Sequence, residues 1–222
     1  MRLGLVTDIH NHAAELARAL ALFREREVDQ VLTIGDTCDA FSNSGAAAEV
    51  AALLHNCGAV GVWGNHDFGL CWEVSEETRQ RYPAATLDYL AQMKPRLTIG
   101  GCHFSHKESS VDAYDVLQLW NVSERRLAME ERAVLAFAAV DHPWQFVGHF
   151  HRWWATTPEQ PVDWTGASPL NFEPHKRYFV IVAAVCDGWC AILDSEQARL
   201  EPLWCGLTEF PDDIQGGGFE LR

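Results

Sequence analysis

Short apolar runs alternate with amphipathic segments along the first third of the chain. Three runs, at Leu3–Thr7, Gln30–Ile34 and Ala59–Trp63, are brief, rich in aliphatic residues and followed by glycine or polar residues, which is typical of buried strands. Between them, Ala13–Glu27 and Ala46–Cys57 carry apolar residues at helical spacing. This β-α-β-α-β order predicts a sheet with parallel strands joined by helices, in an α/β protein.

The middle of the chain departs from this alternation. Residues Phe68–Pro95 are rich in charged and aromatic side chains, so we interpret them as an insertion that lies over or beside a site, with a helix at Ala84–Met93. A further helix is predicted at Ser123–Val140, with Ser123 as its N-cap. Its apolar stripe, the face that normally packs on a core, consists of Leu127, Val134, Leu135 and Ala138.

Further strands are predicted after residue 95, and the last third of the chain is rich in them. These are Leu97–Ser105 (two short strands around Gly100-Gly101), Trp144–Val147, Tyr178–Cys186, Trp189–Asp194 and Arg199–Trp204. Asp187-Gly188, between two of them, is a strong signal for a β-hairpin. A length of 222 residues suits one domain. We place it at residues 1–210 and expect the glycine-rich tail, 211–222, to be poorly ordered.

Composition narrows the class of protein and of partner. Apolar residues make up 48% of the chain and charged residues 22%, as in ordinary globular proteins. A net charge of −14 argues against binding to duplex nucleic acid or to an anionic membrane. No apolar run is long enough to cross a bilayer or to act as a signal peptide, so we expect a cytoplasmic protein. The seven scattered cysteines are expected to be free thiols.

Five clusters of polar residues carry the candidate chemistry, and four of them directly follow predicted strands. They are Asp8-Ile9-His10, Gly35-Asp36 with Asp39, Gly64-Asn65-His66-Asp67, His106, and Gly148-His149-Phe150-His151. Because sites in open α/β sheets form at the carboxyl ends of strands, we expect the clusters to meet. Carboxylates, imidazoles and one carboxamide suit Mn²⁺, Fe²⁺/Fe³⁺ or Zn²⁺, and the lack of a cysteine ligand argues against a structural zinc site.

In this order the clusters resemble the motifs of the calcineurin-like metallophosphoesterase superfamily: Asp-x-His, Gly-Asp-x-x-Asp, Gly-Asn-His-Asp, a single His, and Gly-His-x-His. The resemblance spans residues 8 to 151. It implies a four-layer α/β/β/α sandwich of two mixed sheets, with a dinuclear metal site at the sheet edge. It also implies a metal-dependent phosphoric ester hydrolase, in which two cations clamp a phosphoryl group and activate a water molecule.

The resemblance also implies a role for each residue. The first metal would take Asp8, His10, Asp36 and His151, and the second would take Asp36, Asn65, His106 and His149. Asp36 would therefore bridge the two ions. His66 would protonate the leaving group, Asp67 would orient or charge-balance that imidazole, and Asp39 would be a hydrogen-bond partner outside the metal ligands.

Two departures from the family pattern qualify this assignment. His106 is followed by Lys107 where many relatives have glycine, and His103 is a rival ligand, although Ser105-His106 at a strand end fits better. Ala40 stands where the phosphoprotein phosphatases of the superfamily carry arginine, which argues against a protein phosphatase. Lys107 and Arg152 are candidate contacts for phosphate.

The expected substrate is a small or medium-sized phosphodiester, with a homo-oligomer left open. A phosphomonoesterase or a nucleoside polyphosphate hydrolase is the alternative, and a non-catalytic scaffold of the same fold is disfavoured by the complete ligand set and by His66. Trp72 and Tyr82 are the best candidates to line a substrate pocket. Four other tryptophans, Trp144, Trp153, Trp154 and Trp164, are expected to pack on the sheets, and His12 is interpreted as a helix-start residue.

Overall fold

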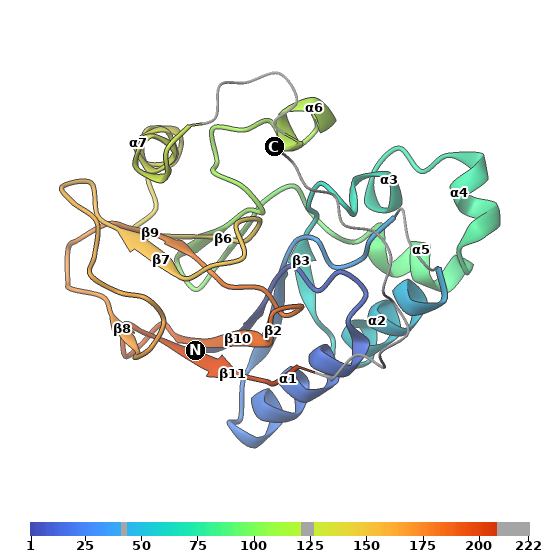
Figure 1. Cartoon of the computed structure of the whole chain (residues 1–222), viewed down its shortest axis with the longest axis horizontal. Helices are drawn as coiled ribbons and strands as arrows, with labels where there is room; N and C mark the ends of the chain where they lie inside the picture. The colour runs from blue at the N-terminus through green and yellow to red at the C-terminus, as the bar shows by residue number, and fades with distance from the viewer. Residues whose placement is uncertain (41–43, 121–126, 208–222) are drawn as a thin grey trace.

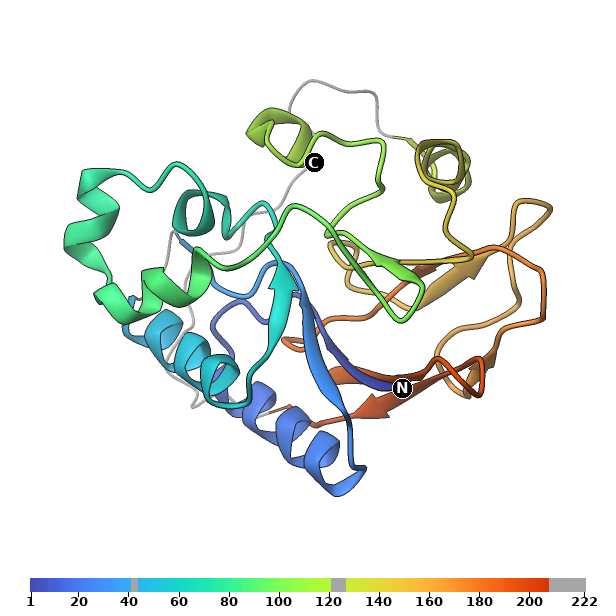
Figure 2. The ribbon, with the colours of Figure 1, turned by 180° about the vertical axis from the view of Figure 1, so that it is seen from behind.

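Two β-sheets pack face to face, and helices cover the outer face of each (Figures 1 and 2). The structure is a computed structural model that describes residues 1–40, 44–120 and 127–207. Helices α1 and α2 lie on one outer face and α7 lies on the other. The predicted α/β sandwich of two mixed sheets is confirmed. The boundary at residue 210 stays a prediction, and the tail, 211–222, lies outside the described residues.

The first sheet contains the parallel strands predicted from the alternation. Its order is β3-β2-β1-β10-β11-β8, in which β1, β2 and β3 are parallel and the other pairs are antiparallel. The strands are β1 (Arg2–Val6), β2 (Gln30–Ile34), β3 (Val60–Val62), β8 (Leu170–Asn171), β10 (Trp189–Asp194) and β11 (Arg199–Trp204). The crossover helices are α1 (Ala13–Glu25) and α2 (Ser44–Asn56). The carboxyl ends of β1, β2 and β3 consequently lie at one edge.

The second sheet faces the first and has the order β4-β5-β6-β9-β7. Its strands are β4 (Leu97–Ile99), β5 (Cys102–Phe104), β6 (Trp144–Val147), β7 (Trp154–Thr156) and β9 (Tyr178–Ile181). Strands β5, β6 and β9 are parallel, and β4 and β7 pair antiparallel at the two edges. Helix α7 (Met129–Ala139) packs on β9.

Apolar side chains on both faces of β1 explain why its sequence is an uninterrupted hydrophobic run. Leu3 and Leu5 point into the core between the sheets, where they join Phe104 and Phe146. Gly4 faces the opposite side, and a Cβ there would lie 2.6 Å from the ring of Phe23 in α1. A strand buried on both faces needs no polar alternation, so its position in the sheet interior follows from the sequence.

Helix α7 presents a different face to the core from the one expected. Val134 and Leu135, predicted to lie in the buried stripe, are 64% and 42% exposed. The buried residues are instead Arg132, which forms an ion pair with Glu108, and two alanines, Ala133 and Ala136. The small side chains of the alanines let the helix approach β9 closely. The predicted apolar stripe is therefore wrong. The helix begins at Met129, and the predicted N-cap, Ser123, lies outside the described residues.

The predicted hairpin at Asp187-Gly188 is also wrong, because the two flanking strands belong to different sheets. Tyr178–Ile181 is in the second sheet and Trp189–Asp194 is in the first. The intervening backbone is bound to the end of β1, where the Cys186 amide donates to the carbonyl of Asp8. The turn exists, but it carries the chain from one sheet to the other and not between paired strands.

The predicted insertion forms short helices beside α2. They are α3 (Phe68–Cys71), α4 (Glu76–Arg81) and α5 (Ala84–Leu90), and α6 (Val116–Leu119) follows later in the chain. Helix α5 packs on α2, and its Tyr89 hydroxyl donates to the carbonyl of Ala59. The expected helix at Ala84–Met93 is confirmed, with its end at Leu90.

All seven cysteines are free thiols, as the sequence indicated. Within the described ranges, no helix is both long and apolar enough to cross a membrane.

Candidate metal centre

The predicted ligands come together at the carboxyl ends of five strands. Asp8 and His10 follow β1, Asp36 follows β2, and Asn65 follows β3 in the first sheet. His106 follows β5, and His149 and His151 follow β6 in the second. The site therefore lies where the edges of both sheets meet, as the order of the motifs predicted.

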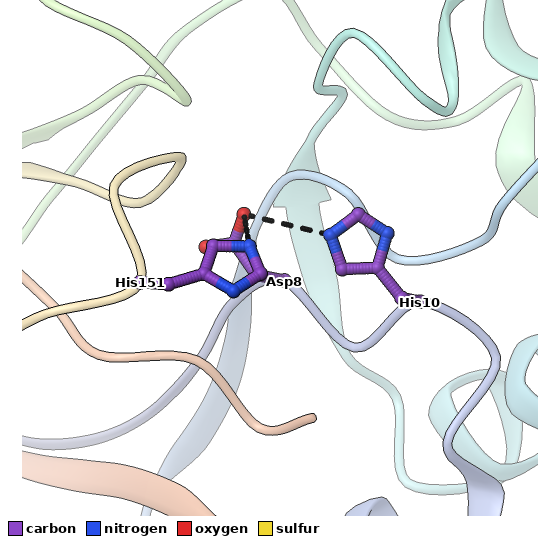
Figure 3. Close-up of side chains that lie close together, drawn as sticks. All are labelled: Asp8, His10 and His151. Atoms are coloured by element: carbon purple, nitrogen blue, oxygen red, sulfur yellow. Dashed lines mark ion pairs between the residues drawn. The ribbon is translucent and has the colours of Figure 1, made fainter. Parts of the chain in front are cut away.

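One group of ligand atoms is formed by Asp8, His10 and His151 (Figure 3). Oδ1 of the buried Asp8 carboxylate lies 3.3 Å from Nε2 of His151 and 4.0 Å from Nε2 of His10. The three ligand atoms lie within 4.8 Å of one another. Such a cluster has the spacing and the donor types of a transition-metal site.

A second group contains Asp36, His106 and His149, with Asn65 beside them. Nε2 of His106 lies 3.2 Å from Oδ2 of Asp36. The Oδ1 atom of Asn65 lies 3.1 Å from Nε2 of His106 and 3.0 Å from Nδ1 of His149. Two imidazoles, a carboxylate and a carboxamide oxygen consequently converge on one point.

Asp36 lies between the two groups. Its Oδ2 atom is 3.2 Å from Nε2 of His106 and 3.8 Å from Nε2 of His10. Its Oδ1 atom accepts a hydrogen bond from the backbone amide of His66 at 2.9 Å. One carboxylate thus faces both clusters while its orientation is fixed by the backbone.

Five of these residues have left-handed backbone conformations, which non-glycine residues rarely adopt. The φ angles are 50° at Asp8, 46° at His10, 48° at Asp36, 67° at His149 and 48° at His151. Asp and His tolerate this region better than most residues, but each such conformation still costs about 1–3 kcal/mol. Strain that recurs at one constellation is typical of a functional site, and the sequence motifs give no direct signal of it.

Two glycines allow the strand ends to approach the ligands. A Cβ at Gly64 would lie 2.1 Å from Oδ1 of Asp36, and a Cβ at Gly148 would lie 1.9 Å from the Thr7 hydroxyl and 2.7 Å from Oδ2 of Asp8. No side chain fits at either position without moving a candidate ligand. The glycines of the motifs are therefore explained by close packing against the ligand carboxylates.

Outer contacts fix the orientation of the imidazoles. Nδ1 of His106 lies 2.8 Å from the carbonyl oxygen of Ile34, so an Nδ1–H donor leaves Nε2 available to a metal. Nδ1 of His151 lies 3.3 Å from Oδ2 of Asp187 and 3.7 Å from Sγ of Cys186. Sequence reasoning missed Cys186 and Asp187, since the Asp-Gly pair indicated a turn and nothing more.

The electrostatics of the site favour an ionised Asp36. Burial raises the pKa of this carboxyl, but the attraction of His106 outweighs burial and holds the pKa below its ordinary range. Burial correspondingly lowers the pKa of His106, and Asp36 overrides it and raises the pKa to about 9. Burial lowers the pKa of His149. A divalent cation would replace the proton that the Asp36–His106 pair holds.

The imidazole of His66 lies beside the first group, and the carboxylate next to it belongs to Asp39. Nδ1 of His66 is 3.4 Å from Oδ1 of Asp39. The ring of His66 packs edge-on against that of His10, with the centroids 4.6 Å apart. Of the two carboxylates considered from the sequence, the structure therefore brings Asp39 to the imidazole.

The carboxylate of Asp67 makes different contacts. It is fully buried and accepts hydrogen bonds from the backbone amides of Thr37, Cys38 and Gly64, at 3.0, 2.7 and 3.0 Å. Burial, with help from the Asp36 carboxylate, raises the pKa of Asp67 to about 6, although the three amides oppose this shift. These bonds hold the loops after β2 and β3 together.

The remaining sequence candidates lie outside the two groups. His103 donates to or accepts from the Ser109 hydroxyl at 2.9 Å, so the histidine brought to Asp36 is His106. The ammonium of Lys107 donates to the carbonyls at the end of α6. Arg152 is exposed and donates to the carbonyl of Phe150 at 3.4 Å. His12 is the N-cap of α1, as expected.

The two residues of the predicted insertion that were expected to line a substrate pocket, Trp72 and Tyr82, differ in their exposure. Tyr82 is buried, and its hydroxyl donates to the carbonyl of Ala40, so it packs under the loop after β2 and does not line the site. Trp72 is exposed and packs against Trp63 and Tyr114.

Comparison with known proteins agrees with the geometry. A family model described as the calcineurin-like phosphoesterase superfamily domain matches residues 1–162. The chain belongs to this superfamily. Membership makes it a metal-dependent phosphoester hydrolase, and the donor set of carboxylates, imidazoles and one carboxamide fits divalent transition metals.

Solved structures share the whole fold at low sequence identity. A metallophosphoesterase from Sphaerobacter thermophilus superposes with a TM-score of 0.73 at 20% identity, covering 94% of this chain and 89% of that one. A hypothetical protein from Pyrococcus horikoshii OT3 gives 0.62 at 13% identity, with 91% and 87% covered. An archaeal phosphodiesterase gives 0.53 at 14%, with 92% and 99% covered. No curated protein sequence is significantly similar to the chain.

Proposed function

We propose that this chain hydrolyses a phosphodiester of a small or medium-sized substrate, using two divalent cations that share Asp36. The observation that carries the proposal is the position of the Asp36 carboxylate, 3.8 Å from His10 and 3.2 Å from His106. Mn²⁺, Fe and Zn²⁺ suit these donors. When bound, such ions supply Lewis acidity and an activated water molecule.

Seven residues would hold the ions in this proposal. Asp8, His10, Asp36 and His151 form one set, and Asp36, Asn65, His106 and His149 form the other. Their loops are preset by backbone hydrogen bonds, such as those from the amides of Ile9 and His10 to the Asp36 carbonyl. Preset ligands lower the cost of ordering the site when metal binds.

His66 is the proposed general acid. Its ring lies at the edge of the first group, next to His10, where a leaving oxygen could accept a proton. Asp39 is 3.4 Å from Nδ1 and would stabilise the protonated imidazole. This assigns to Asp39 the part that the sequence motif suggested for Asp67.

The preference for a diester rests on where the nearby cationic side chains lie. Lys107 donates to carbonyls of α6, Arg152 is exposed, and Arg132 forms a buried ion pair with Glu108. Ala40 supplies no cation at the position where phosphoprotein phosphatases carry arginine. A dianionic monoester needs more positive charge than a monoanionic diester. A fold neighbour described as an archaeal phosphodiesterase is compatible with this choice.

The test compares matched aryl esters. The two esters, bis-(p-nitrophenyl) phosphate and p-nitrophenyl phosphate, release the same phenolate and are therefore directly comparable. The protein loaded with Mn²⁺ should have the higher kcat/KM for the diester. Metal analysis of the same sample should give two ions per chain. A preference for the monoester, or saturation at one ion, would contradict the proposal.

A further inference from the structure

Three exposed aromatic side chains lie on the predicted insertion and on the segment around α6. They are Trp72, Tyr114 and Trp120, which are 41%, 49% and 36% exposed. Trp72 and Tyr114 pack against each other with centroids 4.8 Å apart, and both contact the buried Trp63. Large aromatic side chains that stay accessible beside a polar site are typical of ligand recognition.

Trp120 packs against the imidazole that is proposed as the general acid. Its ring centroid lies 4.6 Å from that of His66, with 50° between the ring planes. His66 is in turn 4.6 Å from His10, a candidate ligand. In the proposed mechanism, a group that leaves the phosphorus atom on the His66 side would therefore lie near Trp120.

Polar contacts hold Trp120 at this place. The residue directly follows α6, whose last carbonyls, at Gln118 and Leu119, accept hydrogen bonds from Nζ of Lys107 at 2.6 and 3.2 Å. Asp115 caps the other end of α6 by accepting from the amides of Leu117 and Gln118. Since Lys107 directly follows the ligand His106, the metal centre and Trp120 are tied to one segment.

Trp72 and Tyr114 pack on Trp63, the residue that directly follows β3. The indole nitrogen of Trp63 donates to the carbonyl of Ala113 at 3.0 Å, directly before Tyr114. The guanidinium of Arg96 donates to the carbonyl of Val111 at 2.8 Å. A stacking surface that is rigid before binding loses little conformational entropy when a ligand arrives.

We propose that Trp120 is a specificity residue that stacks on a planar aromatic group in the leaving group of the substrate. The inference rests on the proposed function and names its substrate class: a phosphodiester whose departing alcohol carries an aryl ring or a nucleobase. Stacking needs no charge, which suits a protein with a net charge of −14. The same charge disfavours a long polyanion as the substrate.

The experiment uses two phosphodiesters that differ in one ring. Methyl 2-phenylethyl phosphate and methyl 2-cyclohexylethyl phosphate release alcohols of similar size and pKa, and release of each alcohol by the Mn²⁺-loaded protein gives KM and kcat. KM should be lower for the phenyl ester. Trp120→Ala should raise KM for the phenyl ester by about 5- to 20-fold, with kcat and the cyclohexyl ester little changed.

Two variants serve as controls. Trp120→Phe keeps an aromatic face and should retain most of the preference for the phenyl ester. Trp204→Ala removes another exposed tryptophan, in β11, and should leave both KM values unchanged. The methyl phosphate ester of thymidine replaces the phenyl ester in a parallel series, so that a larger effect of Trp120→Ala there identifies a nucleobase as the preferred ring.

The outcomes separate this inference from the function on which it rests. If the wild-type protein hydrolyses both esters but Trp120→Ala changes neither KM, or changes both equally, stacking is wrong and the phosphodiesterase function stands. If the metal-loaded protein hydrolyses no diester at all, the proposed function is wrong, and the inference is overturned with it.

Discussion

Oδ2 of Asp36 lies 3.2 Å from Nε2 of His106, while the opposite nitrogen of the same imidazole lies 2.8 Å from the carbonyl of Ile34, two residues before Asp36. The histidine at the end of β5 is thus held at both ring nitrogens by the end of β2, in the other sheet. The geometry of the centre is consequently a product of how the two sheets pack.

Asp36→Asn should disturb both cation sites, because one carboxylate faces both ligand groups. We expect metal affinity to fall by more than the roughly 10- to 100-fold that is typical of losing an outer contact. Elemental analysis after dialysis against Mn²⁺ measures the ions retained. The fully exposed Asp141 offers a matched control, and Asp141→Asn should keep two ions. Loss of a single ion by Asp36→Asn would show that the carboxylate is not shared.

His66→Ala should leave the metal content unchanged and reduce the rate according to the leaving group. A poor leaving group, such as an alkoxide, needs the proton, so the loss there should be about 10²- to 10⁴-fold. A p-nitrophenolate hardly needs it, and the loss should be smaller. Rates on paired alkyl and nitrophenyl diesters measure the difference. Equal losses on both esters, or loss of an ion, would assign His66 to phosphate or metal binding.

Substitution of Asp39 should lower activity, whereas substitution of Asp67 should lower stability. Asp39→Asn weakens support of the His66 imidazole and should resemble a mild His66→Ala, with an unchanged free energy of unfolding. Asp67→Asn puts an amide group against three buried N–H donors and should lower that free energy by about 2 kcal/mol or more. Denaturant titration and alkyl-ester hydrolysis, applied to both variants, measure the two effects. The reverse pattern would restore Asp67 as the partner of His66.

The sequence predicted where the candidate metal ligands lie better than it predicted which face of helix α7 is buried. Ligand motifs after β1, β2, β3, β5 and β6 could be placed together, because carboxyl ends of parallel strands share an edge. The buried face of α7 could not be predicted, because burial there depends on how well Ala133 and Ala136 fit against β9. Val134 and Leu135 are more hydrophobic and are nevertheless exposed. Hydrophobicity alone does not report which face has the right shape.

Long-range contacts account for the other failures. The turn at Asp187 joins different sheets because residues before it bind the end of β1, far away in the sequence. Trp120 could not be selected as a neighbour of His66 without knowing that Lys107 caps α6. In both cases the prediction needs a contact with a distant part of the chain, which the local residue pattern does not contain.

Gly64→Ala should weaken metal binding, because the added methyl group clashes with the candidate ligand Asp36. The added Cβ would lie 2.1 Å from Oδ1 of Asp36, so the carboxylate must rotate away from His106 and from the amide of His66. We expect loss of bound Mn²⁺ and of activity by at least about 10-fold. In Gly69→Ala the new methyl group meets nothing within 4 Å, and alanine favours the helix there, so metal content and Tm should not fall. Full Mn²⁺ occupancy in Gly64→Ala would show that Asp36 can move without harm.

His103 should make the protein lose stability in mild acid. Burial, reinforced by the stacked His142 and by Arg96, lowers the pKa of His103 to about 4, against about 6.5 in the unfolded chain. The unfolded state therefore binds the proton first, so this contribution is fully present above about pH 6.5 and is lost as the pH falls towards 4. Between pH 7.5 and 5 the loss should be about 2 kcal/mol in the free energy of unfolding. His103→Gln should remove that part of the pH dependence, whereas His55→Gln, at an exposed histidine, should keep the wild-type curve. Denaturant titrations across this pH range measure the free energy of unfolding, with a chelator present so that the metal centre is empty in all three proteins. Parallel pH curves for wild type and His103→Gln would show that His103 does not cause the loss of stability.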